Sequence, residues 1–199
     1  MHSRSLLYIS AFVFIISCET KVVTTSNYLD IDSLINAQVK NLIAVKARVK
    51  KNAGLEHVVN QSEHIPDSLG WANELDVFRQ LDMINKPSYK DSYEILDRGK
   101  DINSNLTVRS YEPRKNLSDK EREKLPVRLL KFYYYQEHLK KMEALFTEKN
   151  NLHYTTRIMN LEFDDRQGAG ILSHYSIEGV QKMILTDTVR FRITGDVLY

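Results

Sequence analysis

The sequence predicts an α+β fold: a curved antiparallel β-sheet of about six to eight strands, a meander, covered by N-terminal helices. Apolar residues recur at intervals of three and four between residues 28 and 51, which indicates an amphipathic helix. From Tyr89 onward apolar and polar residues alternate instead, as in strands with one buried face. Connections between these strands are short, so consecutive strands should pair antiparallel, and the helices are the available cover for the apolar face.

The first predicted helix spans residues 28–51. Asp30 or Asp32 is its candidate N-cap, since a short acidic side chain can accept hydrogen bonds from the free N–H groups of the first turn. Basic residues crowd its last turns, where they suit the helix dipole, and Gly54 is expected to end it. The basic end is either a solvated helix terminus or a contact for anionic lipid head groups.

A second helix is predicted from about Ser68 to Ile84. Asp67 or Ser68 can cap it, and Pro87 ends it because proline disfavours helix in the residue before it. Trp71, the only tryptophan, lies in the first turn of this helix. A tryptophan beside an apolar helical stripe belongs either to the core or to a ligand-binding platform.

Strands are predicted in the rest of the chain, with turn-forming residues between them. The clearest covers residues 189–195, whose apolar and polar side chains alternate. The eight candidate strands cover residues 92–97, 106–111, 127–135, 139–148, 152–163, 171–178, 180–185 and 189–195. The charged segment 113–125 is either a mobile loop or a short exposed helix, with Ser118 and Glu121 forming a capping box.

The first residues of the chain have the pattern of an export signal. His2 and Arg4 form a short basic head, and the apolar run from Leu6 to Ile16 is too short to span a bilayer, which needs about 20 apolar residues. Cys18, the only cysteine, follows where the chain turns polar. In an ordinary secretory signal this cysteine would be incidental, or an unpaired thiol awaiting a partner chain.

The residues Ile15-Ile16-Ser17-Cys18 resemble the lipobox of bacterial lipoproteins. In that family the cysteine sulfur is alkylated with diacylglycerol and the chain is cut before the cysteine. The resemblance implies a signal peptide at 1–17, a lipidated tether at 18–27 and a single α+β domain at 28–199. Two or three acyl chains then hold the protein on a membrane far more firmly than one chain would.

Composition limits the function of the mature chain. With Cys18 used as the anchor, no cysteine remains for a disulfide, a metal site or a catalytic thiolate, so the fold depends on its hydrophobic core. A net charge of +2 argues against nucleic acid as a partner. The expected partners are a membrane, through Cys18, and an unknown envelope protein or hydrophobic ligand.

The sequence contains no motif typical of a catalytic, cofactor-binding or metal site. It has no nucleophile elbow, no His-Glu-x-x-His and no glycine-rich phosphate loop. His57 and His64 lie in the loop between the predicted helices and lack metal-ligand spacing. Glu162, Asp164 and Asp165 come closest to a catalytic carboxylate pair, but acidic residues are expected anyway at a strand end that enters a turn. We therefore predict a protein without enzymatic activity, cofactor or metal.

Aromatic residues supply the candidate ligand-binding set. The run Phe132-Tyr133-Tyr134-Tyr135 lies in one predicted strand and must point alternately to opposite faces, so two of the four face away from the core or into a cavity. Tyrosines lining a groove would suit a sugar, peptide or lipid, whereas tyrosines stacked across strands on an outer face only stabilise the sheet. The candidate ligand-binding residues are Trp71, Tyr133, Tyr135, Tyr154 and Tyr175.

Two stretches resemble a family of uncharacterised lipoproteins from Bacteroidetes-type bacteria. They are residues 71–87, beginning Trp-Ala-Asn-Glu-Leu and ending Asn-Lys-Pro, and residues 176–183. The resemblance extends over most of the mature chain and implies an envelope address without an assigned activity. A curved sheet covered by helices on a lipidated tether is also similar in outline, without a shared motif, to the lipoprotein carriers and receptors of the Lol pathway.

The Bacteroidetes resemblance implies two further features. Surface-exported lipoproteins of that group carry an acidic cluster after the cysteine, whereas Glu19 alone is acidic there, which favours an outer-membrane anchor facing the periplasm. The triplets that begin at Asp32, Asp67 and Asp187 match that group's O-glycosylation pattern, and the second of them doubles as a helix cap.

Three functions are compatible with the sequence. A non-enzymatic interaction or scaffold module, which the sequence favours, predicts a filled core and an exposed apolar or aromatic patch. A binding or carrier module for a lipid, peptide or glycan predicts a cavity of several hundred cubic ångströms, lined by alternate strand residues and tyrosines. A hydrolase predicts a pocket with convergent carboxylates or histidines.

Overall fold

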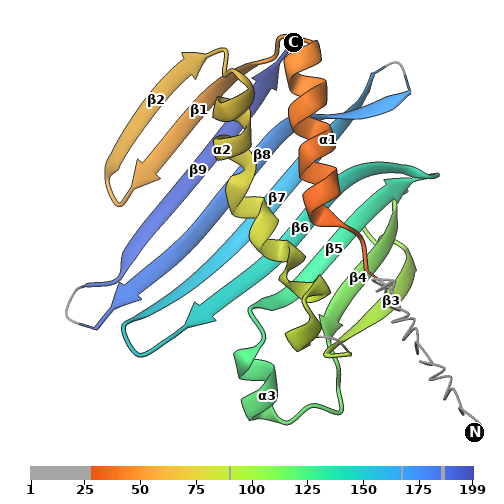
Figure 1. Ribbon diagram of the computed structural model, residues 1–199, viewed down its shortest axis with the longest axis vertical. Coiled ribbons are helices and arrows are strands. Elements are labelled where there is room, and N and C mark those ends of the chain that lie inside the picture. Colours follow the sequence, from red (N-terminus) through yellow and green to blue (C-terminus); the bar gives the residue numbers. More distant parts are fainter. Residues whose placement is uncertain (1–27, 90, 167, 185–186) are drawn as a thin grey trace, which may run out of the picture.

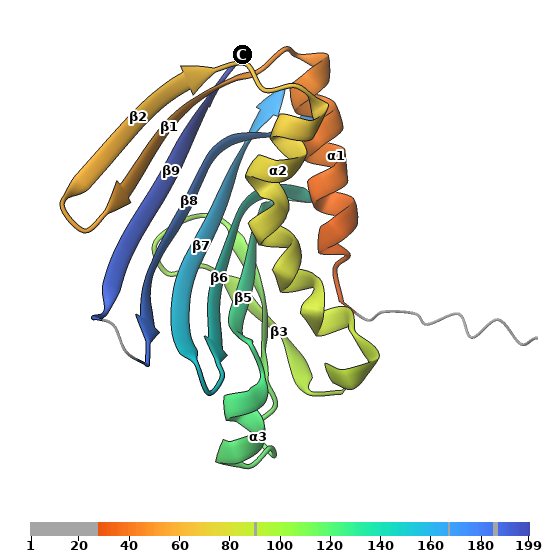
Figure 2. The ribbon, with the colours of Figure 1, turned by 60° about the vertical axis from the view of Figure 1, so that its left-hand side comes forward.

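A computed structural model describes residues 28–199 of the chain, apart from residues 90, 167, 185 and 186. Over these residues the protein forms one antiparallel sheet of nine strands in the order β2-β1-β9-β8-β7-β6-β5-β4-β3. Helices α1 and α2 lie on one face of the sheet, which curves around them (Figures 1 and 2). The predicted combination of helices and a large antiparallel sheet is confirmed, and the sheet is larger than predicted.

The seven strands from β3 to β9 form the predicted meander, in which consecutive strands are neighbours. The hairpin of β1 and β2 then joins the sheet beyond β9, because β1 pairs antiparallel with β9. The strands are β1 (Arg48–Leu55), β2 (Val58–His64), β3 (Tyr93–Lys100), β4 (Thr107–Pro113), β5 (Val127–Tyr135), β6 (His138–Lys149), β7 (His153–Arg166), β8 (Ala169–Met183) and β9 (Val189–Leu198).

The helix predicted over residues 28–51 is shorter in the structure. Helix α1 is Ile31–Ala44, and Lys46 then adopts a left-handed backbone with φ of 51° before β1 begins. Val49 is buried from a strand and Gly54 lies inside that strand, so Gly54 does not end a helix. The apolar residues in this stretch fit the period of an α-helix as well as that of a β-strand, and pairing with β9 favours the strand. The helices are also not all N-terminal, because α2 follows β1 and β2.

The second predicted helix is confirmed as α2 (Ser68–Arg79), continued by the 3₁₀ helix η1 (Gln80–Asn85). The Asp67 side chain accepts a hydrogen bond of 2.7 Å from the Gly70 N–H, and Asp30 caps α1 in the same way through Ser33. A second 3₁₀ turn, η2 (Pro87–Tyr89), follows. Of the two alternatives for segment 113–125, the helix is correct: α3 is Asp119–Lys124, with the Ser118–Glu121 capping box.

Helix α1 is fixed to the sheet by a buried polar contact as well as by apolar packing. Gln38 is 4% exposed, and its amide nitrogen donates a hydrogen bond of 2.9 Å to the Gly170 carbonyl of β8. Its amide oxygen accepts a hydrogen bond of 2.8 Å from the Leu172 N–H. The contact lies beside an irregularity in the β7–β8 register, where strand pairing alone would leave backbone groups without partners.

Helix α2 rests on the sheet through Tyr175 of β8. The Tyr175 ring packs against Gly195 of β9, where an added Cβ would be 2.1 Å from the ring. Phe78 of α2 meets the same ring edge-on at 6.3 Å, and the Tyr175 hydroxyl donates a hydrogen bond to Glu74 of α2. Trp71, Leu75 and Phe78 bury the remaining contact face of α2. Tyr175 therefore sets how closely α2 approaches the sheet.

The packing of Tyr175 on Gly195 predicts the effect of a single methyl group. Gly195→Ala should lower the free energy of unfolding by about 1–3 kcal/mol, since the new Cβ overlaps the ring and forces it to move. Urea unfolding followed by circular dichroism measures the change. Gly54→Ala is the matched control, because its added Cβ would have no neighbour closer than 3.6 Å. Equal stability of the two variants would contradict the packing described here.

Candidate functional site

The helices cover only part of the sheet face on which they lie. Helices α1 and α2 cross the middle strands, and β9, β1 and β2 extend beyond the free flank of α2 (Figure 1). Between that flank and the sheet lies an open hollow of about 670 Å³. We call it the α2 groove. It is lined by Asn73, Glu74 and Val77 of α2 and by Lys51, Glu148, His153, Thr155, Arg157, Ile177, Gln181, Phe191 and Ile193 of the sheet.

The floor of the α2 groove follows from strand register. Side chains opposite each other in neighbouring strands share a face, so Arg157 of β7, Gly179 of β8 and Phe191 of β9 form one row. Ile177 and Ile193 belong to the next row. A Cβ at Gly179 would be 2.8 Å from the Phe191 ring and 3.1 Å from the Arg157 side chain. The missing side chain at Gly179 therefore lets these two groups close in over the strand and leaves an apolar floor.

Gly179 also explains a difference from the prediction. The sequence predicts separate strands at residues 171–178 and 180–185, with the glycine between them. In the structure β8 runs continuously through Gly179 to Met183. The glycine marks a close approach of neighbouring groups, as glycines inside strands often do, and not a turn.

One end of the α2 groove carries charges that neutralise each other. Lys51 of β1 lies 2.6 Å from a Glu74 carboxylate oxygen, and the Tyr175 hydroxyl donates to the same carboxylate. Burial raises the pKa of Tyr175, and the hydrogen bond to Glu74 raises it further, so the hydroxyl remains a donor at neutral pH. Glu74 thus has two partners, and this end has no surplus charge.

The opposite end contains a cation with weak compensation. The Arg157 side chain is 14% exposed and lies over the Phe146 ring, 4.8 Å from its centre. Its closest carboxylate oxygen, from Glu148, is 3.9 Å away, too far for a hydrogen bond. Within the part of the chain that the structure describes, the buried Nε of Arg157 has no hydrogen-bond partner. Burial lowers the Arg157 pKa, which indicates a charged group short of stabilisation.

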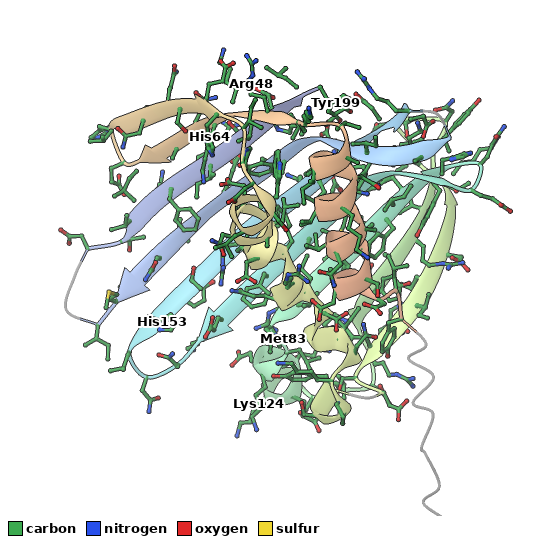
Figure 3. The ribbon with its side chains drawn as sticks, turned by 45° about the horizontal axis from the view of Figure 1, so that its top comes forward. Arg48, His64, Met83, Lys124, His153 and Tyr199 are labelled. Atoms are coloured by element: carbon green, nitrogen blue, oxygen red, sulfur yellow. The ribbon has the colours of Figure 1, made fainter. Side chains whose placement is uncertain are left out.

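Glu148 lies near both Arg157 and His153, and it also borders a second hollow. His153 places its Nε2 3.7 Å from the Glu148 carboxylate, beside the Arg157 pair. A second open hollow of about 680 Å³ borders the same Glu148 and is lined by η1, α3 and the end of β6. Figure 3 shows His153 at the start of β7 and Met83 and Lys124 on the elements flanking this second hollow.

The structure does not bring the predicted ligand-binding aromatics together. Trp71 is fully buried beneath α2, and Tyr175 is buried at the edge of the α2 groove. Tyr133, Tyr135 and Tyr154 belong to rows on the sheet face away from the helices. There Tyr133 donates to Glu143, and Tyr154 accepts from Thr156. Their positions match the alternative in which tyrosines stabilise the outer face.

Sequence reasoning did not single out Arg157, although a signal for it existed. Alternate residues of this strand, Thr155, Met159, Leu161 and Phe163, all lie on the buried side, and Arg157 belongs to the same series. A lone arginine on an apolar strand face is unusual, because a buried charge requires a partner. The absence of a close partner is visible only in three dimensions.

The acidic and histidine candidates do not converge. Asp165 pairs with Lys140, and Glu162 lies 4.0 Å from Lys141, both on exposed parts of the sheet. The Asp165 pKa is lowered, chiefly by its hydrogen bond with Lys140. Among the described residues no group of three or more His, Cys, Asp or Glu side chains could hold a metal ion.

Comparison of the chain with known protein families, with curated proteins and with solved structures finds no match. The resemblances to lipoproteins therefore stay predictions. The predicted signal peptide, Cys18 and the predicted tether lie outside the residues that the structure describes. Among the described residues no helix is long and apolar enough to cross a membrane.

Proposed function

We propose that this chain is a non-enzymatic binding protein of the bacterial envelope, whose α2 groove holds an elongated, partly apolar ligand. The supporting observation is the groove itself, which exposes sheet residues of the core-forming face in a hollow of about 670 Å³. The lining combines four apolar residues, Val77, Ile177, Phe191 and Ile193, with a larger number of polar and charged ones, and hollows of several hundred cubic ångströms that combine apolar surface with polar groups are typical of ligand sites. Alternate strand residues line the groove, as the binding-module hypothesis requires, but its lining contains none of the tyrosines that the same hypothesis predicts.

A scaffold role is the second candidate, and one observation favours it. The β1–β2 hairpin projects past α2 and carries exposed apolar residues, with Leu55 56% and Val58 62% exposed. Exposed apolar patches with polar surroundings mark contact sites for other proteins or for membranes. Because Leu55 continues the row of Phe191 on the groove side, these residues also extend the groove floor, which places the binding role first.

We also propose that the domain is attached to the outer membrane, facing the periplasm, through a lipidated Cys18. The lipobox resemblance and the single cysteine support this address. A tether of residues 18–27 would leave the α2 groove accessible above the membrane surface. The O-glycosylation triplets belong to the same lipoprotein resemblance and are proposed together with the anchor.

The binding proposal predicts that the α2 groove takes up a neutral apolar probe. N-phenyl-1-naphthylamine should bind with increased fluorescence, and Gln181→Trp should weaken this binding at least about tenfold by filling the groove, about 1.4 kcal/mol. Lys182→Trp is the matched control, because the adjacent strand residue points to the opposite face. Absence of probe binding, or equal weakening in both variants, would contradict the binding function.

The anchor proposal predicts a defined mature N-terminus. Protein purified from its native host should begin at Cys18 and carry the mass of a diacylglyceryl group, because lipobox cleavage follows lipidation. Cys18→Ser should abolish that mass and move the protein out of the detergent phase in a phase-partition assay. An unmodified Cys18, or cleavage at another residue, would overturn the lipoprotein assignment.

A further inference from the structure

We infer that the ligand of the α2 groove is a single-chain amphiphile with an anionic head group, and that Arg157 holds this head group. The inference rests on the proposed binding function and specifies its ligand class. It combines two features of the described residues: a poorly compensated guanidinium at one end of the groove and an apolar floor that leads away from it.

The guanidinium of Arg157 is suited to bind an oxyanion. Arginine carries five N–H donors in a planar fork that matches the two oxygens of a carboxylate or a phosphate. Here the Nε is buried without a hydrogen-bond partner among the described residues, and the Glu148 oxygen is 3.9 Å away. Leaving such donors unpaired is costly in a partly buried site. The Arg157 side chain lines the α2 groove and keeps 14% of its surface exposed, so its terminal N–H groups can donate to an anionic ligand there.

The surroundings of Arg157 orient it for this role. Phe146 supports one face of the guanidinium at 4.8 Å, which limits its movement. His153 competes for the same Glu148 carboxylate at 3.7 Å, and the Glu148 side chain is 48% exposed. Glu148 can therefore remain in solvent when an anion pairs with Arg157. Lys51 at the far end is already neutralised by Glu74, so the groove is polarised toward Arg157.

The row of residues beside Arg157 accommodates the apolar part of the ligand. From Arg157 the row passes Gly179 and Phe191 to Leu55, across four neighbouring strands. Three strand spacings of about 4.8 Å give about 14 Å, the length of an extended chain of roughly ten carbons or more. Where the chain passes over β8 it would lie on the Phe191 ring and the Arg157 side chain, which close in over Gly179. Ile177 and Ile193 flank the path on the next row.

Displacement of N-phenyl-1-naphthylamine by twelve-carbon compounds tests the inference on the intact chain. Dodecanoate and dodecyl phosphate should displace the probe at least tenfold more tightly than dodecanol or dodecyltrimethylammonium, at pH 8 and below their micelle concentrations. A preference for dodecanoate over dodecyl phosphate, or the reverse, identifies a carboxylate or a phosphate as the head group. Equal displacement by all four compounds would overturn the anionic assignment.

Variants of the charged pair assign the preference to Arg157. Arg157→Met should bring dodecanoate down to the affinity of dodecanol, whereas Arg190→Met, on the opposite face of the sheet, should leave the preference unchanged. Glu148→Gln, at a half-exposed side chain, should strengthen dodecanoate binding severalfold and leave dodecanol unaffected. The last variant tests the role even if Arg157→Met fails to fold. The assignment of the head group to Arg157 would be overturned if folded Arg157→Met still preferred dodecanoate, or if Glu148→Gln left dodecanoate binding unchanged.

The same titration separates failure of this inference from failure of the proposed function. If the probe does not bind the unmodified protein, the α2 groove is not a ligand site and both fail. If the probe binds and dodecanol displaces it as well as dodecanoate does, the binding function stands and the ligand is uncharged. That outcome rejects only the role of Arg157.

Discussion

The position of α2 relative to the sheet depends on Tyr175. Its ring fills the space between Gly195 below and Phe78 above, and its hydroxyl reaches Glu74 of the helix. Gly195 is needed because any side chain there would overlap the ring. With the aromatic ring as a spacer, α2 remains above β8, and the sheet residues beside it stay open to solvent. The Tyr175 ring therefore lies at the edge of the α2 groove and keeps the groove open.

The two ends of the α2 groove differ in how far their charges are compensated. The Tyr175 end has Glu74 between two donors, Lys51 and the tyrosine hydroxyl, and its charges cancel. The Arg157 end has a guanidinium whose carboxylate neighbour is beyond hydrogen-bond distance. Electrostatic interactions are strongest where water is excluded, so a ligand anion gains most at Arg157. An apolar floor between the two ends completes the arrangement expected for an amphiphile.

The outer face of the sheet differs from the groove in how its polar side chains are paired. Its rows pair polar side chains across strands: Glu178 lies 3.1 Å from Arg192, and the His174 ring is hydrogen-bonded to Asp196 at 2.8 Å. Such ladders stabilise neighbouring strands and keep the surface hydrated. The tyrosines predicted as ligand-binding residues lie partly on this face. The groove is instead formed by side chains that sequence patterns class as ordinary core residues.

Local signals in the sequence predicted what local chemistry determines. The caps at Asp30, Asp67 and Ser118 and the alternation of β9 are properties of short segments; the structure contains the β9 strand as predicted, and each cap is one of the two alternatives predicted for its segment. The helix predicted through residues 45–51 failed because its apolar residues fit a strand as well, and distant β9 provides the pairing. In the sequence, Arg157 is recognisable as a charged residue in a series of apolar ones. Its lack of a close hydrogen-bond acceptor is not, because it depends on the side chains that β6 and β8 place beside β7.

The most direct test of the central claim is methyl NMR of isoleucine-labelled protein during titration with dodecanoate. Ile177 and Ile193 line the α2 groove, and Ile158 lies on the outer face and is 52% exposed. Binding in the groove predicts saturable shifts of the Ile177 and Ile193 methyl signals, with Ile158 unchanged. Shifts centred on Ile158, or unchanged Ile177 and Ile193 signals at saturating dodecanoate, would contradict the assignment of the α2 groove as the ligand site.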